Sequence, residues 1–338
     1  MNNYLNQRKS IRGKFIGIIY SFEGESSPGS EHYDVWRSDV ISDWLKAIQE
    51  IGCIPYILDV RTFAYKAFNK SLPPLDFIVN LNAGNCELSM LGLVPSICGF
   101  LAIPCIPCDT LTAVSGENKI LSNLIAFAKG FNVPEEIDSS DSNGIFRLCN
   151  LGSSCGVKKG FGQTETNYTY QKFIQGFDLT IPILYNPLTN ELEVLPGILY
   201  IPDNRDTQWF LGEQEKEHHS GYKKEIAFID HVTKEKCVDL AKSFFIQTFC
   251  RIDTRIYCKS FDELTQIINN IPFNRVFFLE INPMPTIRNG INFHNSLEYL
   301  DYNSSMNECL QLYREDTPNS SLTGFILSNS IIALTTKH

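Results

Sequence analysis

The chain has 338 residues and carries 29 Lys and Arg against 38 Asp and Glu, which gives a formal net charge of −9. Its length predicts two or three packed domains. A content of 43% hydrophobic and 20% charged residues excludes a disordered or collagen-like chain. The acidic balance argues against binding nucleic acid through the overall field, but it leaves room for a local basic site that binds a phosphorylated small molecule.

The first third of the chain alternates short apolar runs with helical patterns. Residues 35–51 carry apolar side chains at helical spacing. Four apolar runs predict buried strands, at residues 14–20, 54–60, 76–81 and 101–106. Because parallel strands need crossover connections, this alternation predicts a parallel α/β sheet.

A second unit begins near Leu111, and from residue 145 onward its sequence pattern favours strands. Residues 120–130 follow a helical pattern that stops at Val133-Pro134. Turn residues at 186–190 then predict a hairpin. The β-like segments are residues 145–149, 168–174, 179–185 and 192–201.

The C-terminal part mixes helical and strand patterns. A polar loop is predicted at 203–224. An amphipathic helix is predicted at 233–249 and a Ser-capped helix at 260–269. Strands are expected after them, at 251–258 and 275–281.

The eleven cysteines are scattered and odd in number, which favours reduced thiols over a disulfide framework. Cys105 and Cys108 form a CxxC motif without a second ligand pair nearby, so buried strand thiols are favoured over a zinc or redox site. The apolar run at 15–20 is too short for an export signal. The apolar stretch at 322–334 is broken by polar residues and predicts a packed helix rather than a membrane span. We expect a cytoplasmic protein.

Polar side chains recur at alternate positions on the last two predicted strands. Arg251 and Asp253 are two residues apart, as are Glu280 and Asn282, and residues at this spacing share one face of a strand. If the strands pair, three oxygen ligands converge beside an arginine. Such a set suits Mg²⁺, which takes a few protein oxygens together with phosphate oxygens. The alternative is a polar row that faces solvent on a half-exposed sheet.

A glycine- and serine-rich turn, Asn150-Leu-Gly-Ser-Ser-Cys-Gly-Val157, follows a predicted strand. Glycine lets backbone N–H groups approach an anion, and hydroxyls add donors, so this turn is a candidate phosphate cradle. A structural hairpin turn would have a similar composition.

This turn and the run Phe278-Leu-Glu-Ile-Asn-Pro-Met-Pro285, in this order, resemble the ATP-grasp superfamily and, within it, the D-alanine:D-alanine ligase group. The resemblance spans roughly the whole chain. It implies an ATP-grasp fold of class α/β and α+β, with a parallel-sheet N-terminal domain over 1–112, a small central domain over 113–176 and a C-terminal α+β domain over 177–338. It also implies an enzyme that uses ATP and Mg²⁺, with two ions expected and Mn²⁺ as the alternative metal.

The resemblance assigns phosphate contacts to five residues. Lys119 matches a lysine that reaches the nucleotide phosphates. Arg147 stands where a second phosphate-binding lysine is usual, so a planar guanidinium replaces a compact ammonium. Ser153 and Ser154 belong to the glycine-rich turn. Lys216 is the candidate for the lysine of the family's lid. A solvated helix charge is the alternative for Lys119.

The segment around Gln171 resembles the hinge strand that holds adenine. The backbone groups of Lys172, Phe173 and Ile174 match those that bind the ring. Gln171 replaces an adenine-binding glutamate, and its amide oxygen can accept from the exocyclic amine. Asp178 matches a ribose-binding carboxylate; the alternative is an exposed strand acid.

The catalytic cluster follows from the same resemblance. Asp253, Glu280 and Asn282 match the ligands that bridge Mg²⁺ to the triphosphate, and Arg251 matches the arginine that stabilises the acyl phosphate and the tetrahedral intermediate. Phosphoryl transfer to a carboxylate brings anions together, so positioned cations must offset their repulsion.

Substrate contacts are also implied. Ser153 corresponds to a serine beside the substrate site, and Glu31 is preferred over two earlier glutamates as the group that orients the first substrate's amine. Ser296 and Leu297 resemble the segment that holds the acceptor carboxylate. Arg288 lies in an insertion and is a candidate to receive a carboxylate by bidentate pairing; a surface loop arginine is the alternative.

These matches predict an ATP-dependent ligase that joins a carboxylate to an amine through an acyl phosphate and releases ADP and phosphate. The segment Asn82-Ala-Gly-Asn85 departs from the family's pattern, which favours amino-acid or short-peptide substrates in a specialised pathway. The first alternative is the cell-wall D-alanine:D-alanine ligase. The second is a nucleotide-binding regulator without catalysis, suggested by Arg147 and Gln171. No nucleic-acid or membrane partner is expected, and the sequence leaves the oligomeric state open, a homodimer included.

Overall fold

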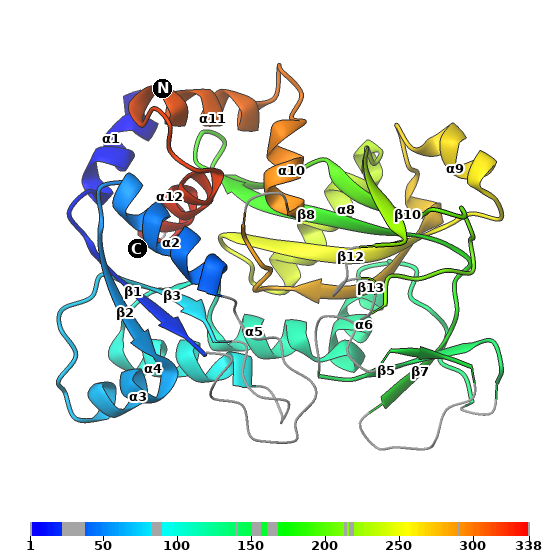
Figure 1. Cartoon of the computed structure of the whole chain (residues 1–338), viewed down its shortest axis with the longest axis horizontal. Coiled ribbons are helices and arrows are strands. Elements are labelled where there is room, and N and C mark those ends of the chain that lie inside the picture. Colours follow the sequence, from blue (N-terminus) through cyan, green and yellow to red (C-terminus); the bar gives the residue numbers. More distant parts are fainter. Residues whose placement is uncertain are drawn as a thin grey trace.

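The computed structural model describes residues 2–21, 38–82, 90–138, 141–150, 157–160, 168–212, 215, 220–288 and 291–336. Within these ranges the strands form one parallel and two antiparallel sheets, in agreement with the predicted class (Figure 1). No helix in the described ranges is long and apolar enough to cross a bilayer.

The N-terminal part contains a parallel sheet in the order β2-β1-β3-β4. Its strands are β1 (Phe15–Tyr20), β2 (Ile54–Asp59), β3 (Phe77–Leu81) and β4 (Cys105–Ile106). The helices of this part are α1 (Asn2–Ile11), α2 (Ser38–Glu50), α3 (Val60–Phe68), α4 (Leu93–Leu101) and the 3₁₀ turn η2 (Met90–Gly92). The four strands occupy the predicted segments, but β4 is shorter than predicted because α4 extends through Leu101.

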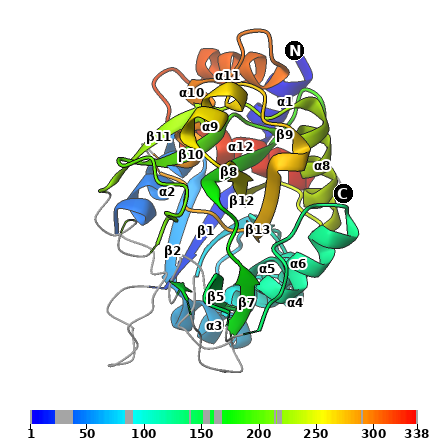
Figure 2. The same cartoon turned by 90° about the vertical axis from the view of Figure 1, so that its right-hand side faces the viewer.

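A small antiparallel sheet follows, in the order β6-β5-β7. It consists of β5 (Gly144–Leu148), β6 (Lys158–Lys159) and β7 (Tyr168–Lys172). Helices α5 (Thr110–Glu117) and α6 (Lys119–Ala128) precede it. In Figures 1 and 2 this sheet lies below the large sheet of the C-terminal part.

The large sheet is antiparallel and has the order β11-β10-β8-β12-β13, with β9 paired to β8. Its strands are β8 (Gly176–Asn186), β9 (Glu191–Val194), β10 (Gly197–Pro202), β11 (Tyr222–Ala227), β12 (Phe249–Tyr257) and β13 (Val276–Asn282). The other elements of this part are α8 (His231–Ser243), α9 (Phe261–Ile267), η3 (Phe273–Arg275), α10 (Asn292–Glu298), α11 (Ser305–Asp316) and α12 (Leu322–Thr335).

Two predictions for this part are confirmed by the structure and two are refined. The hairpin at 186–190 is confirmed, and Ser260 caps α9 by accepting a hydrogen bond from the backbone of Glu263. The single strand predicted at 192–201 is two strands, because the chain leaves β9 at Leu195-Pro196. The predicted loop at 203–224 ends early, because β11 begins at Tyr222 and pairs with β10.

One hydrophobic core joins the two halves of the chain. Buried side chains of α1, β1 and α2 belong to the same cluster as those of β8, β12 and α12. A smaller cluster with α3 and α4 covers the other face of the parallel sheet. Helix α12 contacts α1 and α2 and is buried over nearly its whole length, so the prediction of a packed terminal helix is confirmed. All nine cysteines in the described residues are buried and free, Cys105 and Cys108 among them.

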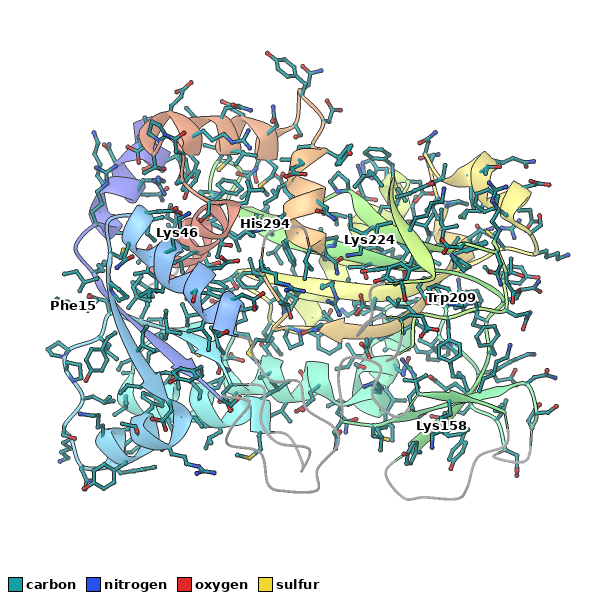
Figure 3. The ribbon with its side chains drawn as sticks, viewed as in Figure 1. Phe15, Lys46, Lys158, Trp209, Lys224 and His294 are labelled. Carbon is teal, nitrogen blue, oxygen red and sulfur yellow. The ribbon has the colours of Figure 1, made fainter. Side chains whose placement is uncertain are left out.

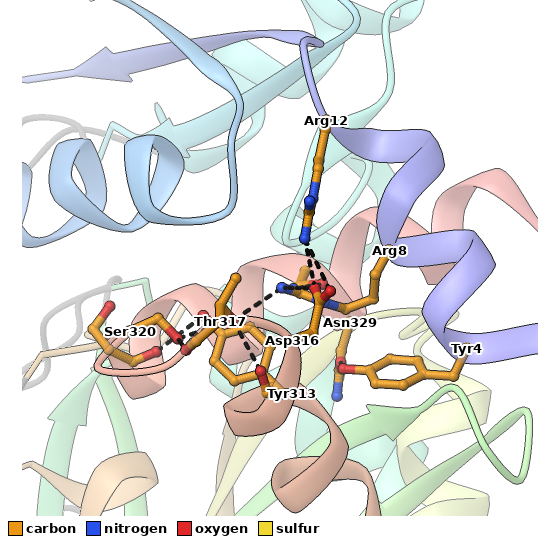
Figure 4. Close-up of polar contacts among 10 residues, drawn as sticks. Tyr4, Arg8, Arg12, Tyr313, Asp316, Thr317, Ser320 and Asn329 are labelled. Atoms are coloured by element: carbon orange, nitrogen blue, oxygen red, sulfur yellow. Dashed lines mark hydrogen bonds and ion pairs between the residues drawn. The ribbon is translucent and has the colours of Figure 1, made fainter. Parts of the chain in front are cut away.

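A buried ion-pair cluster ties α1 to the end of the chain (Figure 4). Arg8 is 1% exposed and donates from Nε and Nη2 to Oδ2 of Asp316, at 3.1 and 2.9 Å. Its Nη1 donates to Ser328 Oγ on α12 at 2.7 Å. Arg12 donates to both oxygens of Asp316 at 2.9 Å, and the Arg8 guanidinium lies 4.3 Å from the centroid of the Tyr313 ring. The cluster therefore fixes α1 to α11 and α12.

We expect Asp316→Asn to lower the free energy of unfolding by about 3–5 kcal/mol near neutral pH, because it leaves the buried Arg8 without its counterion. Burial alone raises the pKa of Asp316, but the hydrogen bonds and charge of Arg8, and then of Arg12, hold that pKa below its usual value. A carboxyl with a lowered folded-state pKa stabilises the protein above its unfolded-state pKa, and this contribution is lost as the pH falls through the folded-state pKa.

Urea denaturation over a pH series measures this effect. The difference between wild type and Asp316→Asn should shrink as the pH falls below about 4, the ordinary range of an aspartate. Glu315→Gln, at an exposed neighbour on the same helix, is the matched control and should leave stability unchanged. A pH-independent difference would contradict the expected role of the Asp316 charge.

Candidate active site

A cavity of about 340 Å³ lies between the small sheet and the large sheet. Side chains of β5 and β7 line one side, and those of β8, β10, β11, β12 and β13 line the other. The predicted site residues in its lining are Lys119, Arg147, Gln171, Lys172, Phe173, Ile174, Asp178, Arg251, Asp253, Glu280, Asn282 and Arg288. Four further predicted residues, Glu31, Ser153, Ser154 and Lys216, lie outside the described residues.

The two strands with the predicted metal ligands are neighbours. Strands β12 and β13 pair antiparallel, with Asp253 opposite Glu280 and Arg251 opposite Asn282. Asp253 Oδ1 accepts a hydrogen bond from Thr180 Oγ1 at 2.7 Å, and its Oδ2 accepts from Nε and Nη2 of Arg251 at 3.0 and 2.7 Å. The condition for convergence stated from the sequence is therefore met.

Lys119 reaches the same cluster from the first position of α6. Its Nζ lies 3.3 Å from Oε2 of Glu280. The backbone N–H of Lys119 donates to the Cys149 carbonyl at 2.8 Å, which ties this helix end to the end of β5. On the preceding helix, a Cβ at Gly116 would lie 2.8 Å from Cδ of Pro283. A larger residue at position 116 would therefore push α5 away from the end of β13.

The cations at this end of the cavity are deeply buried. The side chains of Lys119 and Arg147 are 5% and 8% exposed. Burial lowers the pKa of both groups, and the charge of Glu280 acts in the opposite direction. Arg147 Nε is also buried without a hydrogen-bond partner. Both buried cations lie close to the Glu280 carboxylate, and a ligand with negative charge would further lower the cost of burying them.

Gln171 makes a contact other than the predicted one. Its Oε1 accepts from Nη2 of Arg147 at 2.7 Å, and its Nε2 donates to the Pro134 carbonyl at 3.4 Å. Arg147 Nη2 also donates to the Leu279 carbonyl at 3.1 Å. The Gln171 oxygen is therefore engaged by an arginine in this structure, and its predicted contact with adenine, which would use the second lone pair of that oxygen, stays a prediction. In this structure Gln171 positions Arg147.

Arg255 organises the hinge end of the cavity, and sequence reasoning missed it. It is 3% exposed and donates to the carbonyls of Ile174 and Gly176, and to Asp178 Oδ1 at 2.7 Å. It also donates to the Trp209 carbonyl at 2.5 Å. The sequence did indicate a role for Arg255, because Arg251, Asp253 and Arg255 are each two residues apart, the spacing already noted for the first two.

Asp178 lines the cavity as predicted, but both of its oxygens already accept hydrogen bonds. Arg255 donates to Oδ1, and the backbone N–H of Leu211 donates to Oδ2 at 2.8 Å. Phe173 lies nearby, with its ring centroid 3.9 Å from Nζ of Lys159. This end of the cavity therefore offers an aromatic face and hinge backbone, and Asp178 holds the segment around Leu211.

The structure does not bring two of the predicted substrate residues to the cavity. Ser296 and Leu297 on α10 are buried, and Ser296 Oγ donates to the Pro196 carbonyl at 2.7 Å. Packing of α10 against β10 explains this position. Arg288 does line the cavity, and its Nη1 lies 3.0 Å from Oδ2 of Asp39 on α2.

The same end contains residues that the sequence analysis did not single out, Tyr200, Lys224 and Asn292. Tyr200 donates its hydroxyl hydrogen bond to Asn292 Oδ1 at 2.9 Å. Burial is the main cause that raises the pKa of Tyr200 to about 12. Lys224 was missed because β11 is rich in charged residues and was predicted as part of a loop.

Solved structures share this architecture. A D-alanine–D-alanine ligase from Bacillus anthracis is 12% identical, covers 96% of this chain and 100% of its own, and has a TM-score of 0.61. The same enzyme complexed with ATP is 13% identical over 96% of this chain and 99% of its own, with a TM-score of 0.59. The chain has the ATP-grasp fold.

The VanG D-Ala:D-Ser ligase from Enterococcus faecalis has the same ATP-grasp architecture, with 15% identity, 89% of this chain and 100% of its own covered, and a TM-score of 0.59. No protein-family model matches the sequence, and no curated protein sequence does. At these identities the likeness establishes the fold, and the resemblance stated from the sequence motifs is confirmed at that level.

The donor set of the cavity fits Mg²⁺ held together with a nucleotide. In the described part of the chain, no group of three or more His, Cys, Asp or Glu is placed to enclose a metal. Asp253, Glu280 and Asn282 supply two carboxylates and one amide, which leaves coordination positions for phosphate oxygens and water. Arg147 Nε, which is buried and has no hydrogen-bond partner among the described residues, can donate a hydrogen bond to an anion.

Proposed function

We propose that this chain is an ATP-dependent carboxylate–amine ligase that forms an amide bond with amino-acid or short-peptide substrates in a specialised pathway. The observation that carries the proposal is the pairing of Asp253 with Glu280 inside a cavity that also contains buried cations. Buried charged groups cost free energy that pairing only partly offsets, and an anionic ligand such as a triphosphate would lower the cost of burying Lys119 and Arg147. The fold of the neighbouring ligases supports the same class.

The proposed reaction has two steps. An oxygen of the substrate carboxylate attacks the γ-phosphorus of ATP, and the bond from that phosphorus to the ADP oxygen breaks. The nitrogen of the amine then attacks the carbonyl carbon of the acyl phosphate, phosphate leaves with the bond electrons, and the amine proton passes to solvent. The products are an amide, ADP and phosphate.

Each charged residue of the cavity has a part in this scheme. Lys119 and Arg147 bind the phosphates, since their burial makes a nearby anion favourable. Arg251, oriented by Asp253, faces the charge that develops on the reacting carboxylate. Mg²⁺, when held by Asp253, Glu280 and Asn282, supplies positive charge that offsets the repulsion between triphosphate and carboxylate.

The nucleotide base is proposed to lie against the hinge backbone of Lys172, Phe173 and Ile174. We also propose domain boundaries at 1–112, 113–176 and 177–338. Each sheet falls within one of these ranges, except that β8 begins one residue before the last boundary.

A second candidate function is the cell-wall D-alanine:D-alanine ligase, which the names of the solved neighbours favour. The position of Ser296 and Leu297 weighs against it, because the segment proposed to hold the acceptor carboxylate is buried against β10. The two candidates therefore differ in the acceptor pocket, which a substrate panel can compare directly.

ADP and phosphate release with a panel of acids and amines, D-alanine included, tests the proposal. We expect ADP, phosphate and an amide product detected by mass spectrometry to appear together in equal amounts for at least one pair. Efficient and selective D-alanyl-D-alanine formation would replace the specialised role by the cell-wall role. If Mg²⁺·ATP raises the melting temperature but no pair releases ADP above background, the chain is a nucleotide-binding regulator and the ligase proposal fails.

A further inference from the structure

The end of the cavity farthest from the hinge carries more positive than negative charge among the described residues. Arg251 is paired with Asp253 at 2.7 Å, and Arg288 is paired with Asp39 at 3.0 Å. Lys224 also lines the cavity, and none of the described carboxylates forms an ion pair with it. Among the described residues, one positive charge at this end therefore has no ion-pair partner.

Lys224 is placed here by strand pairing. Strand β11 pairs with β10, with Lys224 opposite Tyr200, and the ammonium nitrogen lies 5.8 Å from the centroid of the Tyr200 ring. In the view of Figure 3, Lys224 lies between His294 of α10 and Trp209. Burial, and after it the charges of Arg288 and Arg251, lowers the pKa of Lys224. All three cations line the same cavity.

Arg288 adds an unsatisfied donor. Its side chain is 19% exposed, and its Nε is buried without a hydrogen-bond partner, although Nη1 contacts Asp39. A buried donor without a partner costs free energy, which a ligand with an acceptor group recovers. Because Asp39 belongs to α2 and Arg288 follows β13, the pair also links the two halves of the chain beside the cavity.

We propose that Lys224 and Arg288 form a subsite for a second carboxylate of the substrates, distinct from the carboxylate that ATP activates. The inference rests on the proposed ligase function and names its substrate class. A carboxylate carries one negative charge, which matches the Lys224 charge that no described carboxylate pairs with, and its two oxygens suit a guanidinium and an ammonium together. This subsite takes the part expected for Ser296 and Leu297.

Two sources supply such a group. It is either the carboxylate of an amino-acid or peptide acceptor, or the second carboxylate of a dicarboxylic acid that is activated at its other end. In both cases the bonds that form and break are those of the ligase reaction, and the subsite only positions the substrate.

Turnover with matched substrates tests the subsite. For a pair that supports ADP release, the acceptor is compared with its carboxamide, and the acid with its monoamide. We expect the wild-type kcat/KM to fall about 10–100-fold for whichever substrate loses its second charge, the range of one hydrogen bond to a charged group. In Lys224→Gln and Arg288→Gln this discrimination should disappear through a raised KM for the charged substrate, with the KM for ATP unchanged.

Lys223→Gln is the matched control. Lys223 is the neighbouring lysine on β11, pairs with Glu225 and does not line the cavity, so its replacement should leave both substrates unchanged. Equal discrimination in wild type, Lys224→Gln and Arg288→Gln would overturn the subsite while leaving the ligase proposal intact.

A binding measurement separates the subsite from catalysis. If no pair supports ADP release, thermal stabilisation by succinamate, which carries one carboxylate, is compared with that by succinamide, its uncharged diamide. A larger shift with succinamate that Lys224→Gln removes and Lys223→Gln retains supports the subsite even though the ligase proposal has failed. Equal shifts with the two probes in wild type overturn it.

Discussion

Asp253→Asn and Glu280→Gln are each expected to lower ATP turnover at least about 100-fold, the loss seen when one positioned electrostatic group is removed from an active site. The two carboxylates face each other across β12 and β13 in the cavity. Without one of them, the protein holds fewer negative oxygens for Mg²⁺ next to the triphosphate. We therefore also expect the stabilisation by ATP to lose its dependence on Mg²⁺.

The fold should survive both substitutions. Asp253→Asn should lower the free energy of unfolding because Arg251 loses its counterion, but the Asn side chain can still accept the hydrogen bond from Thr180. In Glu280→Gln the buried Lys119 can lose its proton when the Glu280 charge is removed. Asp262→Asn, which changes an exposed carboxylate on α9, is the control and should behave as wild type. Thermal shifts with ATP alone and with Mg²⁺·ATP provide the measurement, together with ADP release. Turnover near the wild-type rate in both variants would remove the metal assignment.

The elements that carry the metal ligands could be predicted because their signals are local. An i, i+2 spacing on a strand places Arg251 with Asp253 and Glu280 with Asn282 on shared faces. The pairing of those strands could be stated only as a condition, since β12 and β13 are separated by α9 and register depends on tertiary packing. The structure supplies that register, with Asp253 opposite Glu280.

The end of the cavity that contains Lys224 could be predicted less well than the strands that carry the proposed metal ligands. Strand β11 reads Tyr-Lys-Lys-Glu-Ile-Ala, whose charged residues resemble a solvated loop, and it becomes a strand because β10 offers it hydrogen bonds. Lys224 therefore has no sequence signal of its own. The placement of Ser296 was predicted from a motif, but in the structure α10 packs against β10 and Ser296 donates to the Pro196 carbonyl.

The contact between Gln171 and Arg147 could not be predicted from the sequence, for a different reason. Its motif position is compatible with contact to a base, and the sequence also places an arginine where a lysine is usual. The two departures are coupled in space, because Gln171 Oε1 accepts from Arg147 Nη2 at 2.7 Å. A planar guanidinium reaches an amide oxygen that a lysine would leave to the ligand. A contact of this kind between residues 24 positions apart can be identified only from coordinates.

Arg255→Met is expected to lower the free energy of unfolding by about 3–5 kcal/mol and to raise the KM for ATP, because it removes a buried arginine and leaves the Asp178 carboxylate, 16% exposed, without its partner. Methionine has a similar length and no hydrogen-bond donors. The carbonyls of the hinge and of the segment around Trp209 would then lose the donor that connects them. Urea denaturation and ATP titration measure the two effects.

Two further variants distinguish the effect of the Arg255 charge from the effect of its hydrogen-bond geometry. Arg255→Lys keeps the charge but offers a compact ammonium instead of a fork, so it should recover only part of the stability and of the ATP affinity. Arg275→Met is the control on the same side of the large sheet: Arg275 is 33% exposed and 3.8 Å from Glu263, and its loss should cost less than about 1 kcal/mol. If Arg255→Met binds Mg²⁺·ATP as tightly as Arg275→Met, the hinge does not depend on Arg255. If Arg255→Lys behaves as wild type, charge alone accounts for the role of Arg255, and its fork of donors is dispensable.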